Sequence, residues 1–231
     1  MTTEASPESG RLVVEIIAAE HSLDRRGKTI TTFVVFDAAT ELEEMAEGEL
    51  LEILTDEFEP FERDIAAWCQ ATGHALRASE ATLAGHRFVI EKRIPKTKDA
   101  SLAMVISDAG LEELLSPLGF ALAAALEGIQ VHLYFQGPAV RVLTRGFRPR
   151  LSGWARPFSR FAASSMTKAG HIPAQEKLQQ LLRLGARLYV CGGSLQPFKV
   201  RREDFIFDDL PIVEYLTFMS IMEDAEIHLY V

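Results

Sequence analysis

The hydrophobic pattern of the first 95 residues predicts a small α+β unit. Apolar, β-branched runs indicate strands, and apolar residues at helical spacing indicate helices. The predicted strands cover residues 12–19, 49–55, 74–81 and 86–94, and the predicted helices run from a cap at Thr31 or Thr32 to Gly48 and from Pro60 to Gly73. In the second helix Cys69 shares a face with Ile65 and Trp68, which predicts a buried core cysteine. The order β-α-β-α-β-β predicts a two-layer α+β domain over residues 11–95, with both helices on one face of the sheet.

The pattern changes after the polar segment Pro95–Asp99, which is the best candidate for a linker. Strands then alternate with helices of ten or more residues. The predicted strands are 101–107, 129–135, 186–190 and 225–231, and the predicted helices are 111–126, 175–184 and 212–222. This alternation predicts a second α/β domain over residues 99–231, with a mostly parallel sheet covered by helices on both faces. Sites in such sheets form at the carboxyl ends of the strands.

Cys191 stands at one of these predicted strand ends. The apolar run 186–190 leads into Cys191, which is followed by Gly192, Gly193 and Ser194. Ser194 is a good N-cap residue, so a helix is expected to begin there. The free amides of Gly192, Gly193 and Ser194 and the positive end of the helix dipole would then favour the thiolate, which is the nucleophilic form. The alternative is a buried structural cysteine that acts as a small apolar residue.

Composition places the chain in an ordinary globular class. It has 231 residues, of which 48% are hydrophobic and 25% are charged. No apolar stretch reaches the roughly 18–20 residues of a membrane span, and residues 1–10 lack the apolar core of a secretory signal. The 2 cysteines form neither a disulfide framework nor a metal or dithiol motif, so we expect no metal and a reducing cytoplasm. The net charge of -9 argues against nucleic-acid binding.

The charge is unevenly distributed. Up to Pro95 there are 19 acidic and 9 basic residues, whereas the segment from Arg141 to Arg183 holds 9 basic residues and one acid, Glu176. This basic segment is a candidate binding site for an anionic ligand or an acidic partner, and its candidate residues are Arg141, Arg145, Arg148, Arg156 and Arg160. The simpler alternative is that these arginines are solvent-exposed surface residues without a binding role. The pattern of residues 156–168 also predicts an amphipathic basic helix. We expect this helix to pack on a partner subunit, and contact with a membrane surface is the less favoured alternative.

The first 95 residues resemble the TusA/SirA family of sulfur carriers. The matching parts are Leu23-Asp24-Arg25-Arg26-Gly27, Gly48-Glu49-Leu50-Leu51-Glu52-Ile53 with Asp56, Asp64-Ile65 and Thr72-Gly73-His74. In that family a Cys-Pro pair follows the Arg-Gly pair, and the cysteine carries sulfur as a persulfide. Here Ile30 and Thr31 stand in the two positions, and neither can hold a transferable sulfur. We therefore expect the first domain to serve in docking or oligomerisation instead of carrying sulfur itself.

Residues 99–231 resemble the DsrE/DsrF-like family, in the variant with a long insert before the cysteine strand. The matching parts are His171-Ile172-Pro173, the helix 176–184, Leu188-Tyr189-Val190-Cys191, Ser194-Leu195 and Glu203-Asp204. The resemblance implies a flavodoxin-like sheet, homo-oligomers, and a cysteine that accepts and donates sulfane sulfur, which Cys191 matches. His171, which precedes a helix, is a candidate neighbour of the thiol.

Two functions from different classes follow. In the first, the protein traffics sulfur between donor and acceptor proteins as a persulfide on Cys191, with no metal or organic cofactor. In the second, it is a non-catalytic interaction or regulatory protein derived from sulfur carriers. The loss of the Cys-Pro pair fits the second function, whereas the thiol at the strand end favours the first. A dithiol redox enzyme would need Cys69 close to Cys191, and nothing in their spacing supports that.

Overall fold

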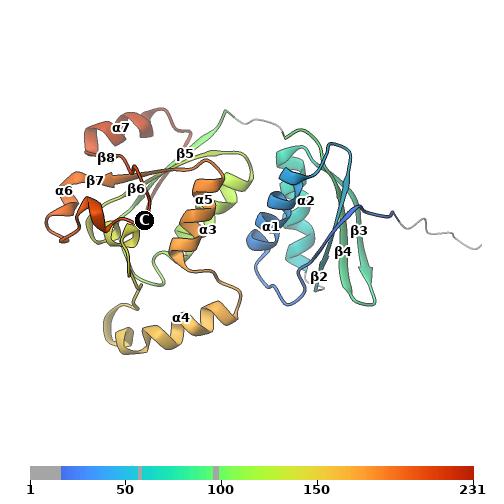
Figure 1. Ribbon diagram of the computed structural model, residues 1–231, viewed down its shortest axis with the longest axis horizontal. Coiled ribbons are helices and arrows are strands. Elements are labelled where there is room, and N and C mark those ends of the chain that lie inside the picture. Colours follow the sequence, from blue (N-terminus) through green and yellow to red (C-terminus); the bar gives the residue numbers. More distant parts are fainter. Residues whose placement is uncertain (1–16, 57–58, 96–98) are drawn as a thin grey trace, which may run out of the picture.

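A computed structural model of the chain describes residues 17–56, 59–95 and 99–231 (Figure 1). It contains two β-sheets, each formed by its own part of the chain. Helices of both parts lie between the sheets, with α1 (Thr31–Glu44) and α2 (Glu59–Thr72) against the first sheet and α3 (Leu115–Leu126) and α5 (Ala174–Arg183) against the second. One further helix, α7 (Tyr215–Glu223), covers the opposite face of the second sheet.

The first part is the two-layer α+β unit that the sequence predicts. Its four strands form a sheet in the order β1-β2-β4-β3, in which β1 runs parallel to β2 and the other pairs are antiparallel. Its two helices cover one face of this sheet. The elements are β1 (His21–Asp24), α1 (Thr31–Glu44), β2 (Leu50–Thr55), α2 (Glu59–Thr72), β3 (Ala75–Thr82) and β4 (Gly85–Glu91).

The predicted strand 12–19 lies largely outside the described residues, and the strand that pairs with β2 is β1, at residues 21–24. The predicted cap of α1 is wrong. The residue that caps α1 is Ile30, without a side-chain hydrogen bond, and Thr31 is the first helical residue. Thr31 is buried because the start of α1 faces the second part of the chain, so its hydroxyl is not used as a cap.

The second part is an α/β unit with a parallel sheet, as predicted. Its strands lie in the order β8-β7-β6-β5-β9 and every neighbouring pair is parallel, which gives flavodoxin-like layers of helix, sheet and helix. The strands are β5 (Ser101–Ile106), β6 (Gln130–Phe135), β7 (Arg187–Cys191), β8 (Ile212–Val213) and β9 (Ile227–Tyr230). The α-helices are α3 (Leu115–Leu126), α4 (Ser159–Lys168), α5 (Ala174–Arg183), α6 (Gly192–Leu195) and α7 (Tyr215–Glu223), and the 3-10 helices are η1 (Gly137–Leu143), η2 (Gly153–Phe158) and η3 (Arg202–Asp204).

The predicted helix 212–222 begins too early. Ile212 and Val213 instead form the short edge strand β8, in which Val213 pairs with Cys191. β-branched residues suit a strand, and at this position they cover the edge of β7. The helix α7 starts only after Glu214, whose backbone is extended.

The alternation of side chains along β7 decides where the cysteine lies. Leu188 and Val190 point into the larger core beneath α3 and α5, whereas Tyr189 and Cys191 point to the opposite face, beneath α7. Successive side chains of a strand take opposite faces of the sheet, so Cys191 is fixed on the α7 side.

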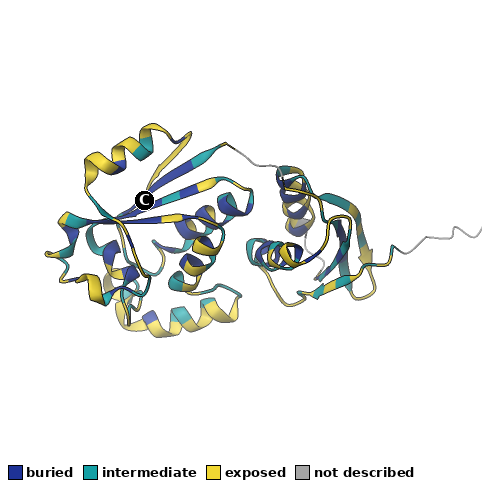
Figure 2. Ribbon diagram, turned by 45° about the horizontal axis from the view of Figure 1, so that its top comes forward, coloured by how far each residue is buried: buried dark blue, intermediate teal, exposed yellow. Residues whose placement is uncertain are grey.

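The larger core runs through both parts of the chain. It joins residues of α1 and α2 to residues of α3, α5 and the second sheet, and the buried residues line the space between the two sheets (Figure 2). Hydrogen bonds cross the junction: Trp68 Nε1 donates to the Leu126 carbonyl at 3.0 Å, and Thr29 Oγ1 donates to the Ala169 carbonyl at 2.8 Å. The domain limits 11–95 and 99–231 stay a prediction, because residues 11–16 and 96–98 lie outside the described residues.

No helix within the described residues is both long and apolar enough to span a bilayer. The cytoplasmic location stays a prediction.

Candidate functional site

Cys191 lies at the carboxyl end of β7, the strand next to the edge strand β8, and is only 1% exposed. It belongs to the smaller core on the α7 side of the sheet, together with Tyr134, Tyr189, Phe218 and three small apolar residues. The sequence placed the cysteine correctly at a strand end. A thiol that exchanges sulfur must be reached by a partner, and in this conformation the thiol is covered.

The local structure after Cys191 differs from the prediction. The short helix α6 begins at Gly192, so Cys191 itself occupies the N-cap position and the prediction that Ser194 caps the helix is wrong. Ser194 is buried, and its Oγ accepts a hydrogen bond from the Gly137 amide at 2.8 Å, which joins α6 to η1. A helix of four residues also carries only a small dipole. Stabilisation of a thiolate by Gly192, Gly193 and Ser194 stays a prediction.

Glu214 explains why glycine follows the cysteine. A Cβ atom on Gly192 would lie 2.4 Å from Glu214 Oε1, so the carboxylate occupies the space that a side chain would need. At Gly193 a Cβ atom would lie 3.6 Å from Glu214 Oε2 and 3.9 Å from Cys191 Sγ. The carboxylate and the thiol therefore share the same glycine surface. No local signal in the sequence marks Glu214, because only the tertiary fold brings the start of α7 beside β7.

Two tyrosines surround the thiol. Burial, followed by interaction with Cys191, raises the pKa of Tyr134, whose buried hydroxyl has no hydrogen-bond partner among the described residues. The charge of Cys191, followed by burial, raises the pKa of Tyr215. Tyr134 lies deep in the core, whereas Tyr215 begins the exposed helix α7 and is 59% exposed. Of the two tyrosines that cover the thiol, Tyr215 is therefore the one that can move without disturbing the core.

A hollow of about 430 Å³ opens beside this cover. Its lining includes Tyr134, Gln136, Tyr215, Phe218 and Tyr230. Cys191 does not line the hollow, but its neighbours Tyr134, Tyr215 and Phe218 do. A displacement of Tyr215 would thus connect the thiol to a preformed surface recess without unfolding the sheet.

We predict that replacing Tyr215 with alanine speeds the labelling of Cys191 by iodoacetamide by about tenfold or more. Alanine removes a side chain that interacts with the thiol and extends to the surface, and reagent access limits the reactivity of a buried thiol. The measurement is the rate of mass gain at the Cys191 peptide, which separates it from the buried Cys69.

The matched control is Tyr230→Ala. Tyr230 lines the same hollow, but its hydroxyl accepts a hydrogen bond from Gln136 Nε2 at 2.7 Å, and it has no described contact with the thiol. Its replacement should leave the labelling rate within a factor of two. Equal rates for Tyr215→Ala and the wild-type protein would show that another element closes the site.

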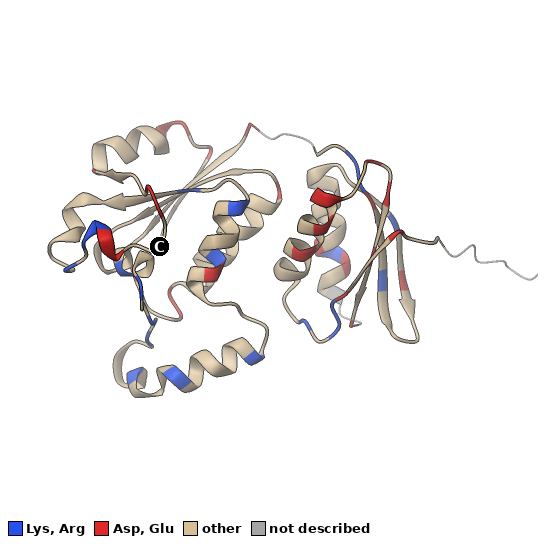
Figure 3. Ribbon diagram, viewed as in Figure 1, with Lys and Arg blue, Asp and Glu red and all other residues tan. Residues whose placement is uncertain are grey.

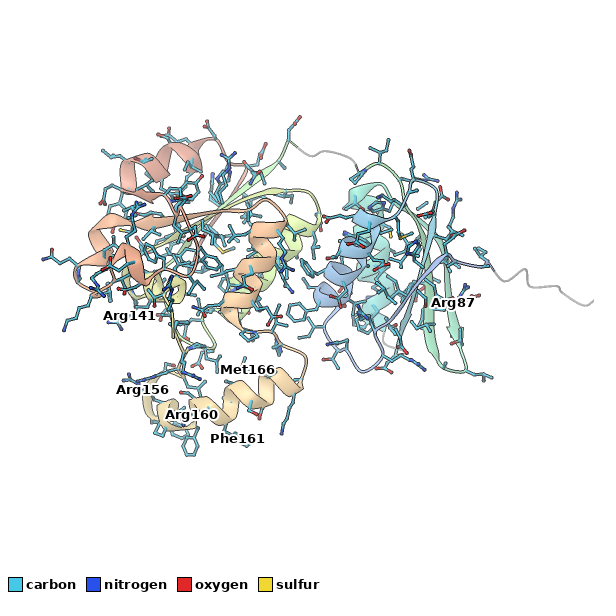
Figure 4. The ribbon with its side chains drawn as sticks, viewed as in Figure 1. Arg87, Arg141, Arg156, Arg160, Phe161 and Met166 are labelled. Carbon is cyan, nitrogen blue, oxygen red and sulfur yellow. The ribbon has the colours of Figure 1, made fainter. Side chains whose placement is uncertain are left out.

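The five candidate arginines do not gather at Cys191. Arg141 and Arg145 line a separate recess, where the Arg141 guanidinium lies 5.4 Å from the ring centre of Phe198. Arg156 and Arg160 lie on η2 and α4 (Figure 4), and Arg148 is an exposed residue of the intervening loop. The structure thus separates the five arginines into two groups, one at the recess beside Phe198 and one in and before the basic helix. Anion or partner binding by these residues stays a prediction.

The basic helix of the insert projects from the body of the second part (Figure 3). Its predicted apolar face is divided: Phe158 and Phe161 are exposed, whereas Met166 faces a cavity beneath the helix. His171 lines that same cavity and not the hollow beside Tyr134 and Tyr215, so the structure does not bring it to the thiol.

The second cysteine is a core residue, as predicted. Cys69 is buried in α2 within the larger core, and burial raises the pKa of its thiol to about 12. Cys191 belongs to the other core, and both cysteines are free. Among the described residues no group of His, Cys, Asp or Glu side chains is arranged to hold a metal ion.

Comparison with known proteins assigns the second part of the chain. The family model described as DsrE/DsrF-like matches residues 100–229, which is more than half of the sequence and includes Cys191. The chain belongs to the DsrE/DsrF-like family.

A second family model, described as sulfurtransferase TusA, matches residues 34–92 of this DsrE/DsrF-like protein. The two matches, in this order, confirm the predicted fusion of a TusA-like and a DsrE-like segment. The TusA match begins after Ile30 and Thr31, the two positions where the sulfur carriers have their Cys-Pro pair. These residues start α1, and Thr31 lines a recess between α1, α2 and α3.

Other comparisons add little. A crystal structure of the ychN protein from E. coli is similar over 57% of this chain and 99% of that chain, with 14% identity and a TM-score of 0.41. A likeness at this level carries no argument about function. No curated protein gives a significant match.

Proposed function

We propose that this protein accepts and donates sulfane sulfur as a persulfide on Cys191. Both of its families imply a role in sulfur relay. The single observation that carries the proposal is the position of Cys191: it ends strand β7 of the parallel sheet, next to a surface recess, within the segment that matches the DsrE/DsrF-like family.

The transfer needs no cofactor. The Cys191 thiolate attacks the outer sulfur of a donor persulfide, a new S–S bond forms on Cys191, and the donor sulfur bond breaks to release a thiolate. The second transfer is the same step with an acceptor thiol. Atoms and electrons balance without an external oxidant. Glu214, whose carboxylate lies against the two glycines that follow the cysteine, is the candidate to accept the thiol proton before the attack.

In this proposal the TusA-like segment acts as a docking unit. Its former carrier position, Ile30 and Thr31, lies at the start of α1, and Thr31 lines the recess shared with α3. A sulfur on this position would face the protein's own second part and not an external partner. Trp68 fixes the same helical face to Leu126. The sulfur donor and acceptor proteins, the homo-oligomer and the cytoplasmic location belong to this proposal.

The test is the mass of the protein after incubation with polysulfide. We expect additions of 32 Da units (about one sulfur atom each) on the Cys191 peptide, removed again by a thiol reductant. The Cys191→Ser variant should show no addition, and Cys69→Ser, which alters only a buried core thiol, should load like the wild-type protein. Equal loading of Cys191→Ser and the wild-type protein would end the proposal.

One observation favours the second function, a non-catalytic interaction protein. The thiol is almost fully buried, as a structural cysteine would be. The two functions differ in labelling at neutral pH: a relay thiol must react with iodoacetamide in the folded protein, whereas a structural thiol reacts only when the protein unfolds. The dependence of the labelling rate on urea concentration separates them, because only the structural thiol requires global unfolding.

A further inference from the structure

A cavity of about 140 Å³ lies beneath the basic helix α4, away from Cys191. The β5–α3 loop, α4 and the start of α5 enclose it, and its walls are mostly apolar, including Leu111, Leu114, Met166 and Ile172. A dry cavity of about 150 Å³ is known to hold a molecule the size of benzene. This cavity is thus large enough for one ring or for a short aliphatic chain.

The wall of the cavity contains a buried ammonium group. Lys177 is 3% exposed, and its Nζ donates one hydrogen bond, to the Leu115 carbonyl at 3.1 Å. The same nitrogen lies 5.8 Å from the ring centre of Phe33. A lysine ammonium has three N–H donors, and among the described residues the partner of this one is the Leu115 carbonyl and not a carboxylate. Burial of a cation without a paired anion is unfavourable, so a negative charge at this site would stabilise it.

His171 adds a second nitrogen to the cavity wall. Burial, followed by the positive charge of Lys177, lowers the pKa of His171. The two basic side chains therefore influence each other across an apolar space. The helix α4 covers this space with Met166, while Phe161 extends from the opposite side of the helix (Figure 4).

We propose that the cavity beneath α4 binds a small organic carboxylate, whose apolar body fills the cavity and whose charged group pairs with Lys177. The volume limits the body to about the size of one ring, and the apolar walls exclude inorganic anions, which would remain hydrated in solvent. The carboxylate supplies the negative charge that Lys177 lacks, and its second oxygen is available to a hydrogen bond from His171. This inference does not involve Cys191, so its failure leaves the proposed sulfur transfer intact.

The test is calorimetric titration of the full chain with benzoate and with toluene, which has the same ring without the charge. We expect saturable binding of benzoate to the wild-type protein. The Lys177→Met variant keeps the apolar length of the side chain and removes its charge, so benzoate binding should weaken at least tenfold while toluene binding stays within a factor of two.

A second variant, Ala163→Leu, checks the location. Ala163 lies on the face of α4 that lines the cavity, so a larger side chain should displace both benzoate and toluene. The proposal is wrong if wild-type protein does not bind benzoate, if Lys177→Met binds it as well as the wild type, or if Ala163→Leu leaves benzoate binding unchanged.

Discussion

Replacing Trp68 with alanine is expected to lower the free energy of unfolding by about 3–5 kcal/mol, the range for truncation of a large buried aromatic residue. Trp68 is 5% exposed in α2, belongs to the core shared by both parts of the chain, and donates its indole N–H to the Leu126 carbonyl at 3.0 Å. The alanine variant loses the buried ring and the hydrogen bond together. The junction between the TusA-like and DsrE-like segments should weaken most.

Urea denaturation followed by far-UV circular dichroism measures this loss. The wild-type protein should unfold in one transition, because its core is continuous, whereas the variant should unfold at a lower urea concentration and in two steps. The control is Trp154→Ala, at a residue that is 88% exposed. Its effect should stay within about 0.5 kcal/mol, as for most surface substitutions. An equally stable Trp68→Ala protein would show that the two segments do not share a core.

Replacing Lys177 with methionine is expected to stabilise the protein by about 2 kcal/mol at pH 7. Burial lowers the pKa of Lys177 from its ordinary value of 10.5 to about 8, which corresponds to a cost of about 3 kcal/mol for the charged form in the folded state. Loss of the hydrogen bond to the Leu115 carbonyl offsets about 1 kcal/mol of the gain. A residue that lowers stability where it stands is more readily explained by a role in binding than by packing.

The pH dependence has a defined sign. Between pH 8 and 10.5 the unfolded state binds more protons at Lys177 than the folded state, so the free energy of unfolding of the wild-type protein rises with pH across this window. Below pH 8 the full cost is present. The advantage of the methionine variant should therefore be greatest at pH 7 and shrink towards pH 10.5.

The measurement is a series of urea titrations from pH 7 to pH 10.5, compared with Lys168→Met. Lys168 is an exposed lysine at the end of α4, so its replacement should leave stability unchanged throughout. A Lys177→Met protein whose stability gain does not vary with pH would rule out the titration of Lys177 as the cause.

The sequence by itself determined the order of elements and the family. The periodicities of 2 and 3.6 residues located the strands β2 to β7 and the helices α1 to α5 to within a few residues, because the side-chain pattern of a buried face is local information. The fusion of TusA-like and DsrE-like segments was also readable, since it rests on short motifs. The start of α7 was misplaced because pairing with β7 makes a strand of Ile212 and Val213, and strand pairing is not local information.

Only the tertiary structure decided the surroundings of the reactive groups. Glu214, Tyr134 and Tyr215 meet Cys191 although they are 20 or more residues away from it in the sequence. Lys177 looked like one more cation of a basic segment, and it became a buried ammonium only when α4 folded over α5 and Phe33 of α1 packed against it. Burial and electrostatic interaction depend on distance in space, so the order of residues along a chain does not contain them directly.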